Sequence, residues 1–186
     1  MGLDLVPNST TFLAFLDDDD TWEPKKMIIQ LTFMDRMDIQ LGGTNALKMD
    51  ADQPYFLPLS TRIFKFSDFL KQNELVTSSV VVSRELFYAG NAFPAIKPSG
   101  EDYVLWLKIH FGGTKSCRLA ECLVNYQDSG ISLSRQLNEN GSQQKLRILR
   151  AFREDSHLGF FRKFARINSY RLMFEIRAEA KKNAKN

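Results

Sequence analysis

The sequence predicts an α/β fold, a mixed sheet with flanking helices that is followed by a helical C-terminal extension. Two observations predict this class. Strand-like and helix-like patterns alternate between residues 11 and 126, and such alternation is typical of α/β proteins. Beyond Gly130 the apolar spacing is helical only, over residues 141–155 and 157–182.

The expected elements begin with a short apolar strand at residues 11–16, which runs into four consecutive aspartates. A helix then opens at Glu23-Pro24, because proline suits the first turn of a helix. Apolar residues at helical spacing are expected to form its core face. These residues are Met27, Ile28, Leu31 and Met34.

The middle of the chain contains the strongest strand signal, at residues 76–82, because β-branched side chains fit a pleated sheet. A weaker strand over residues 39–49 is expected to break at Gly42-Gly43. Ser67 is expected to cap a short helix that follows. The other expected segments are a loop at 50–62, helices at 83–87 and 103–111, and strands at 114–119 and 122–126.

Charge divides the chain into two parts. Residues 1–134 carry 12 Lys and Arg against 17 Asp and Glu, whereas residues 135–186 carry 13 against 5. We therefore expect a domain over 1–134 and a basic amphipathic helical tail over 135–186. No apolar run reaches transmembrane length, and with no signal peptide expected, the predicted location is the cytoplasm.

The run of four aspartates at residues 17–20 is the outlying feature, since adjacent carboxylates repel one another. In open α/β sheets, loops at the carboxyl ends of strands are where ligands bind. Carboxylate oxygens favour Mg²⁺ or Mn²⁺, and such a cation is commonly shared with substrate phosphates. The alternative is a solvated acidic turn that stabilises the N-terminus of the helix at residue 23. The run by itself favours neither interpretation.

A second acidic pair, Glu101 and Asp102, follows Gly100 and opens a predicted helix. A buried carboxylate at this place would serve as a general base. The alternative is an ordinary acidic cap at a helix N-terminus, which is the more frequent explanation for an isolated pair.

Taken together, these segments resemble glycosyltransferase family 2, whose members have the GT-A fold. Residues 15–26 are similar to that family's Leu-Asp-x-Asp-Asp-x-Trp segment and the helix behind it. Residues 100–107 are similar to its Glu-Asp-Tyr-x-Leu-Trp-Leu segment on the acceptor side. Residues 78–87 and 123–132 complete the match, in the family's order and spacing.

The resemblance implies an inverting sugar transfer from a nucleotide diphosphate sugar to a polysaccharide or a lipid-linked acceptor. The family's Asp-x-Asp motif falls on Asp17, Asp18 and Asp19. Asp19 is then the best ligand for Mg²⁺ or Mn²⁺ and Asp17 a second one, while Asp17 and Asp18 lie nearest the donor. The metal would stabilise the leaving diphosphate. Asp102 becomes the base that deprotonates the acceptor hydroxyl, and Glu101 helps to place the acceptor.

Members of that family open with a nucleotide-binding strand, a helix and a further strand before the metal-site strand. This sequence begins near the helix before that strand, so we expect the N-terminal nucleotide-binding half to be lacking. A sheet without those strands is expected to leave backbone groups unpaired. The alternative function is accordingly a non-catalytic remnant or split half that binds a partner chain or a membrane surface.

Residues 157–182 combine apolar residues at helical spacing with interleaved arginine and lysine. Such a helix suits an anionic membrane surface, which predicts peripheral contact with the inner face of the membrane. The alternative is a helix packed on the domain with a solvated basic face. Nucleic acid is not an expected partner, because no nucleic-acid motif is present and the body is acidic. Trp22 and Trp106 are expected to pack in the core.

Overall fold

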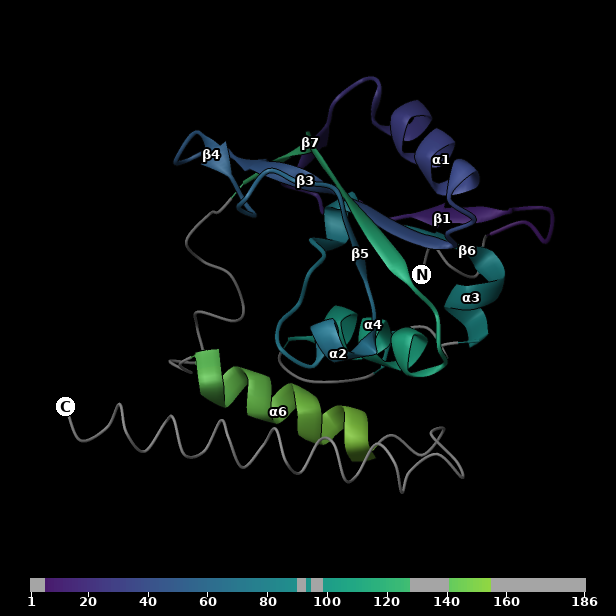
Figure 1. Cartoon of the computed structure of the whole chain (residues 1–186), viewed down its shortest axis with the longest axis vertical. Coiled ribbons are helices and arrows are strands. Elements are labelled where there is room, and N and C mark those ends of the chain that lie inside the picture. The colour runs from purple at the N-terminus through teal and green to yellow at the C-terminus, as the bar shows by residue number, and fades with distance from the viewer. Residues whose placement is uncertain (1–5, 90–92, 95–98, 128–140, 155–186) are drawn as a thin grey trace.

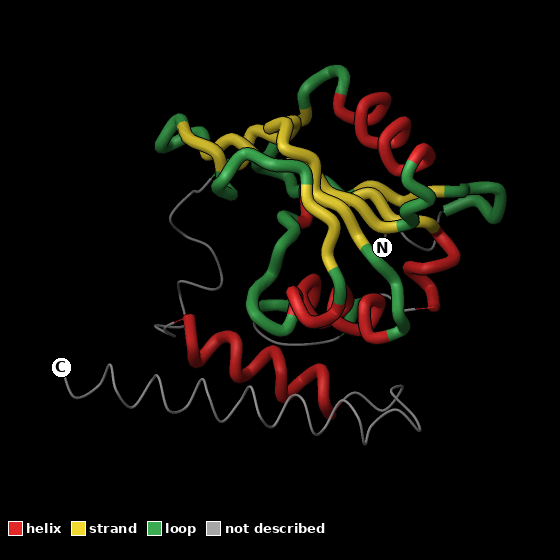
Figure 2. Tube along the Cα trace, viewed as in Figure 1, coloured by secondary structure: helices red, strands yellow, loops and turns green. Residues whose placement is uncertain are grey.

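The computed structural model describes residues 6–89, 93–94, 99–127 and 141–154, and these form three layers (Figures 1 and 2). A mixed sheet separates helix α1 from helices α2 and α4, and α6 packs against the outer side of α4. The helices are α1 (Lys26–Arg36), α2 (Phe66–Phe69), the 3₁₀ turn η2 (Thr77–Ser79), α3 (Arg84–Ala89), α4 (Glu101–Phe111) and α6 (Gly141–Glu154).

The described strands follow the order β1-β6-β3-β7-β2, with β4 on β3 and β5 on β7. Strands β3 and β7 run parallel, whereas the other pairs are antiparallel. Among these strands β1 pairs only with β6, so its other edge has no described partner. The strands are β1 (Phe12–Ala14), β2 (Thr21–Trp22), β3 (Leu41–Lys48), β4 (Gln53–Pro54), β5 (Arg62–Phe64), β6 (Val81–Ser83) and β7 (Ser116–Tyr126).

The strand expected at residues 76–82 is confirmed only at its end, in the short strand β6, because the 3₁₀ turn η2 takes the place of its earlier part. Side chains from elsewhere explain the difference, because they take up its carbonyl groups. The indole Nε1 of Trp22 donates to the carbonyl of Ser78 at 2.7 Å. The amide of Gln30 donates to the carbonyl of Ser79 at 3.0 Å. Tertiary hydrogen bonds therefore override the β propensity of this segment.

Strand β3 runs without a break through Gly42 and Gly43, where an interruption was expected. A Cβ atom at Gly42 would lie 2.8 Å from Sδ of Met34, and one at Gly43 would lie 2.7 Å from Cδ2 of Leu75. The two glycines thus allow α1 and the segment before η2 to approach the sheet closely, which is a recognised use of glycine within strands.

The two strands expected at 114–119 and 122–126 are one continuous strand, β7. Its pairing with β3 shifts register on both sides of Asn45, so its apolar pattern is interrupted although its backbone is not. The loop expected at 50–62 contains β4, and β2 was not expected either. Both are two residues long, too short to show a period-two pattern.

Helix α4 confirms the helix expected at 103–111, although it begins two residues earlier, at Glu101. Helix α2 has Lys65 rather than Ser67 at its N-cap, because the N–H of Lys65 donates to the carboxylate of Asp68 at 3.0 Å. As expected, the apolar residues of α4 are buried, namely Val104, Leu105, Leu107 and Ile109.

Helix α6 confirms the helix expected at 141–155. Three of its side chains belong to the main hydrophobic core, so this core extends beyond residue 134: Ile148, Leu149 and Phe152. The membrane-binding helix expected at 157–182 lies outside the described residues. Within the described part of the chain, every helix is too short or too polar to span a bilayer.

The expected core face of α1 is partly wrong, because Ile28 is 67% exposed and the buried side chains are Lys26, Gln30 and Met34. Gln30 lies there because its amide also donates to the carbonyl of Gly42 at 2.8 Å, which joins the helix to β3. A helical pattern of apolar residues cannot predict that two polar residues at positions i and i+4, Lys26 and Gln30, are buried.

Lys26 carries a prediction about the pH dependence of stability. Its ammonium donates to Oε1 of Gln30 at 2.8 Å and lies 4.4 Å from the ring centroid of Trp22. Burial lowers its pKa from the ordinary 10.5 to about 8. Between about pH 8 and pH 10.5 the unfolded chain therefore binds the Lys26 proton more tightly than the folded chain does. The contribution of this group to the free energy of unfolding rises with pH over this range, by about 3 kcal/mol.

We expect wild type to gain this amount relative to Lys26→Met between pH 7 and pH 10.5, measured by urea denaturation at each pH. The comparison with the variant cancels the titration of all other groups. Lys25→Met removes an exposed ammonium from the neighbouring position and is the matched control. A difference between wild type and Lys26→Met that stays constant over this range would contradict the assignment.

Candidate active site

The four aspartates form a tight turn behind β1. The backbone N–H of Asp20 donates to the carbonyl of Asp17 at 3.3 Å, and Asp18 and Asp19 occupy the exposed tip between them. The N–H of Asp17 in turn donates to Oγ of Ser78 at 3.1 Å. This hydrogen bond joins the turn to η2, which lies directly before strand β6.

Asp20 is the buried member of the run, with 5% of its surface exposed. Its Oδ1 accepts a hydrogen bond from the N–H of Gln127 at 2.8 Å, whereas its buried Oδ2 has no partner among the described groups. Buried carboxylate oxygens without a partner are uncommon, so this oxygen is a candidate ligand atom. Sequence reasoning missed it, because nothing in a run of identical residues marks which one turns inward.

The start of α4 brings the second acidic pair into place. Gly100 has a φ of +100°, and a Cβ there would lie 2.9 Å from Ile148 of α6, so a side chain would be excluded on both counts. The Oδ2 atom of Asp102 accepts hydrogen bonds from Oγ1 of Thr77 at 2.9 Å and from Nδ2 of Asn73 at 3.3 Å. These two bonds hold the carboxylate at the start of the helix.

Asp17, Glu101 and Asp102 line one pocket of about 270 Å³. Asp102 also lines a second pocket, of about 530 Å³, so its carboxylate borders both spaces. The structure thus brings three of the five predicted site residues together from distant parts of the chain, while Asp18 and Asp19 are not among the lining residues. The remaining walls of the smaller pocket are Phe15, Leu16, Thr77 and Phe93.

The surroundings of this pocket raise the pKa of two of its carboxyl groups. Burial raises the pKa of Asp17, and the charges of Asp20, Asp19 and Asp102 raise it further, against a hydrogen bond from Ser78 that lowers it. Burial also raises the pKa of Asp102. Such crowding of negative charge is relieved by a cation or by a proton.

The carboxylates of the acidic turn fit a divalent cation that is only partly held by protein. In the described residues, no three His, Cys, Asp or Glu side chains are grouped to hold a metal by themselves. Mg²⁺ commonly takes only one or two carboxylates and completes its shell with water and substrate phosphates. The all-carboxylate turn, the raised pKa of Asp17 and the unpartnered Oδ2 of Asp20 fit a cation of that kind.

The aromatic residues behind the pocket are structural. Trp106 is fully buried, which confirms the expectation of core packing. Its ring lies 6.3 Å from those of Phe15 and Phe93, which line the pocket. Trp22 is half-buried and donates to Ser78, as described above. Neither tryptophan is among the residues that line the smaller pocket.

The fold, a mixed α/β sheet with flanking helices, is of the GT-A type, as its likeness to a solved structure shows. It is similar to the solved structure of S. aureus TarS residues 1–349 in complex with UDP-GlcNAc, with a TM-score of 0.62. The likeness covers 94% of this chain and 49% of that one, and at 11% sequence identity it concerns the fold alone.

Sequence comparison adds two particular relatives. An uncharacterized glycosyltransferase of Rickettsia bellii is 28% identical over 110 residues, which is 58% of this chain and 16% of that protein. Another, from Rickettsia felis, is 30% identical over 101 residues, or 53% of this chain and 17% of the relative. No family model matches the chain. The chain is thus related to glycosyltransferases, and the match spans less than a fifth of these relatives' length.

Proposed function

We propose that this chain is part of an inverting glycosyltransferase of family 2 that uses a nucleotide diphosphate sugar. The observation that carries the proposal is the meeting of Asp17 with Glu101 and Asp102 at one pocket. The likeness to Rickettsia glycosyltransferases supports sugar transfer. The UDP-GlcNAc bound to TarS supports a nucleotide-sugar donor.

In this proposal the acidic turn serves the donor. Asp19 and Asp17 would hold Mg²⁺ or Mn²⁺, with the free Oδ2 of Asp20 as a further ligand atom. When bound, the cation would neutralise the charge that develops on the departing diphosphate. Asp17 and Asp18 would contact the nucleotide sugar.

Asp102 is the base of the proposed reaction, because it borders both pockets. It takes the proton of the acceptor hydroxyl while that oxygen bonds to the anomeric carbon and the bond from this carbon to the diphosphate breaks. Attack opposite the leaving group inverts the anomeric centre. A raised pKa makes the carboxylate a better proton acceptor. Glu101, whose buried Oε2 has no described hydrogen-bond partner, is placed to accept from an acceptor hydroxyl.

The larger pocket suits the acceptor. Three amide side chains line it, from Gln72, Asn73 and Gln144, and amides can both donate to and accept from sugar hydroxyls. We propose a polysaccharide or lipid-linked glycan as the acceptor class.

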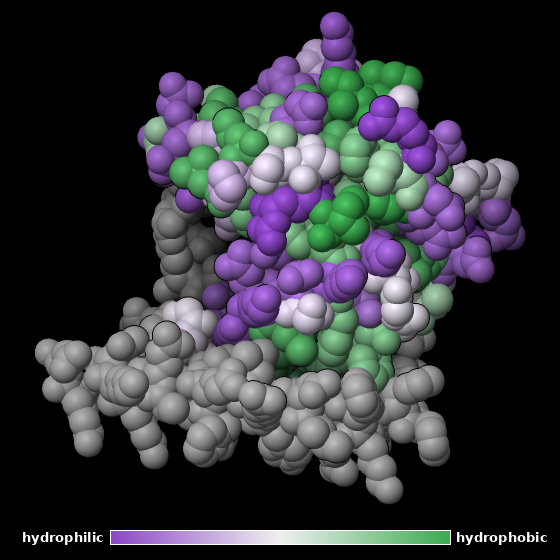
Figure 3. Space-filling view, in the orientation of Figure 1, coloured by the Kyte–Doolittle hydropathy of each residue, from purple (hydrophilic) through white to green (hydrophobic). Residues whose placement is uncertain are grey.

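Figure 3 shows hydrophilic and hydrophobic residues interspersed over the described face of the molecule, where no single continuous apolar surface dominates.

The donor site is tested by calorimetric titration of the purified chain with UDP and with GDP, each with Mn²⁺. We expect metal-dependent binding of one nucleotide, weakened at least tenfold (about 1.4 kcal/mol) in Asp19→Ala. Asp35→Ala removes an exposed carboxylate from α1 and is the matched control. Absence of binding by the folded chain would contradict a self-sufficient donor site.

A second candidate function is a split half that binds a partner chain. The observation in its favour is β1, the strand that leads into the acidic turn, which pairs only with β6 among the described strands. An unpaired strand edge is a template for another strand. If the folded chain binds no nucleotide, this candidate takes the first place.

A further inference from the structure

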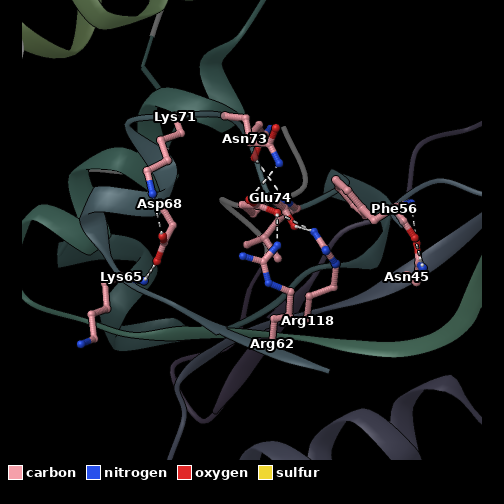
Figure 4. A network of polar contacts seen from close by, with 11 residues as sticks. Asn45, Phe56, Arg62, Lys65, Asp68, Lys71, Asn73, Glu74 and Arg118 are labelled. Carbon is pink, nitrogen blue, oxygen red and sulfur yellow. Dashed lines mark hydrogen bonds and ion pairs between the residues drawn. The ribbon is translucent and has the colours of Figure 1, made fainter. Parts of the chain in front are cut away.

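A buried ion pair lies within and beside residues 73–77, the segment whose side chains hydrogen-bond the Asp102 carboxylate (Figure 4). Nη1 of Arg118, on β7, donates to Oε2 of Glu74 at 2.8 Å and to the carbonyl of Glu74 at 2.9 Å. The Arg118 guanidinium lies 3.7 Å from the ring centroid of Phe56, and 2% of the residue is exposed. Arg118 therefore hydrogen-bonds both the side chain and the backbone of Glu74.

A contribution to the stability of the fold does not by itself explain why this buried ion pair is present. Removing two charges from water is costly, and well-packed apolar residues of similar size often stabilise a core as well or better. What an apolar pair would not supply is a directed bond to the Glu74 carbonyl. That bond fixes the backbone of the segment at a defined place above β7.

The residues on each side of Glu74 are those that bond Asp102. Asn73 donates to its Oδ2 from one side, and Thr77 donates to the same oxygen from the other. Asn73 is itself oriented, because its Oδ1 accepts from the N–H of Leu75 at 3.2 Å. A continuous chain of hydrogen bonds thus runs from β7 through the segment at 73–77 to the Asp102 carboxylate, which borders both pockets.

We propose that Arg118 and Glu74 are positioning residues, which hold the Asp102 carboxylate in its reactive orientation through Asn73 and Thr77. This inference rests on the proposed function, in which Asp102 is the base. Arg118 does not line either pocket, so it touches neither substrate. Arg118 contacts the segment at 73–77 through Glu74 and also stacks on Phe56, while Glu74 accepts a further hydrogen bond from Nε2 of Gln72 at 2.9 Å.

The test is the double variant Arg118→Met/Glu74→Met, which replaces the ion pair with apolar side chains and leaves no buried charge unpaired. We expect it to fold, with kcat lowered about 10- to 100-fold by misplacement of the base and with the donor KM unchanged. Amide hydrogen exchange at residues 73–77 should quicken. Arg62→Met is the matched control, because Arg62 lies 3.8 Å from the same carboxylate oxygen but is 42% exposed; it should change neither kcat nor exchange.

A second variant keeps the proposal open to refutation if the double variant does not fold. Thr77→Val has the same shape but cannot donate to Asp102, and we expect a several-fold lower kcat with the Arg118–Glu74 pair intact. A folded double variant with wild-type exchange at 73–77, or a Thr77→Val variant with wild-type kcat, would overturn the proposal. If wild type transfers no sugar, the proposed function fails, and the exchange rates still decide whether Arg118 holds the segment.

Discussion

Asp102→Asn is expected to lower kcat by about two to four orders of magnitude, the usual contribution of a positioned general base. Asparagine has nearly the same shape and can still accept from Thr77 and Asn73, so the fold and the donor KM should persist. What is lost is the ability to take the proton of the acceptor hydroxyl. Initial rates over a range of donor concentrations separate kcat from KM.

The pH profile sharpens this test. Burial raises the pKa of Asp102, so the base becomes protonated and activity falls at a pH above the ordinary carboxyl value of 3.8. Wild type should show this acid limb and Asp102→Asn should lack it. Glu121→Gln, an exposed carboxylate on β7, is the control and should keep the wild-type profile. A wild-type rate in Asp102→Asn would rule out the assignment.

Trp106→Ala is expected to lower the free energy of unfolding by about 3–5 kcal/mol, because it empties a large space in a fully buried site. Helix α4 would lose the ring contacts of Trp106 with Phe15 and Phe93, which are walls of the smaller pocket. Nucleotide binding should therefore weaken even at temperatures where the variant is folded. Guanidinium denaturation measures the stability change.

Trp106→Phe is the matched control for that prediction. The indole N–H of Trp106 has no hydrogen-bond partner in the described structure, so its removal leaves no acceptor unpaired. We expect phenylalanine to cost much less than alanine, since most of the ring volume and contact remains. Equal losses for the two variants would show that the aromatic packing does not support this part of the core.

The sequence predicted the α/β class and the helices α4 and α6 because long, strongly periodic segments carry their own signal. The sequence-based predictions failed where contacts between residues distant in the sequence determine the local structure. The first part of the strand expected at 76–82 is the 3₁₀ turn η2 instead, because the side chains of Trp22 and Gln30 donate to its carbonyl groups. Lys26 is buried in α1 although its side chain is charged, and no local pattern announces this.

The same distinction applies to the site. Glu101 and Asp102 stood out as an acidic pair that opens a helix, the resemblance to glycosyltransferase family 2 implied their roles, and the structure puts them with Asp17 at one pocket. The supporting residues were missed, because Asn73, Thr77 and Glu74 stand in a segment without a motif. Arg118 was missed too, because its strand also contains other polar residues such as Ser116 and Glu121, so its charge does not mark it. Whether Asp18 and Asp19 act on the donor stays a prediction.

The bonds that fasten the acidic turn also have a kinetic consequence. Asp17 bonds a residue 61 positions away, and Asp20 bonds one 107 positions away. Closing loops of this size costs entropy before the contacts repay it, which slows folding of proteins rich in distant contacts. The pocket therefore forms late, and in a refolding experiment its ability to bind nucleotide should return only after the helices have formed. A chain arrested halfway through folding would look structured and still be unable to hold a donor.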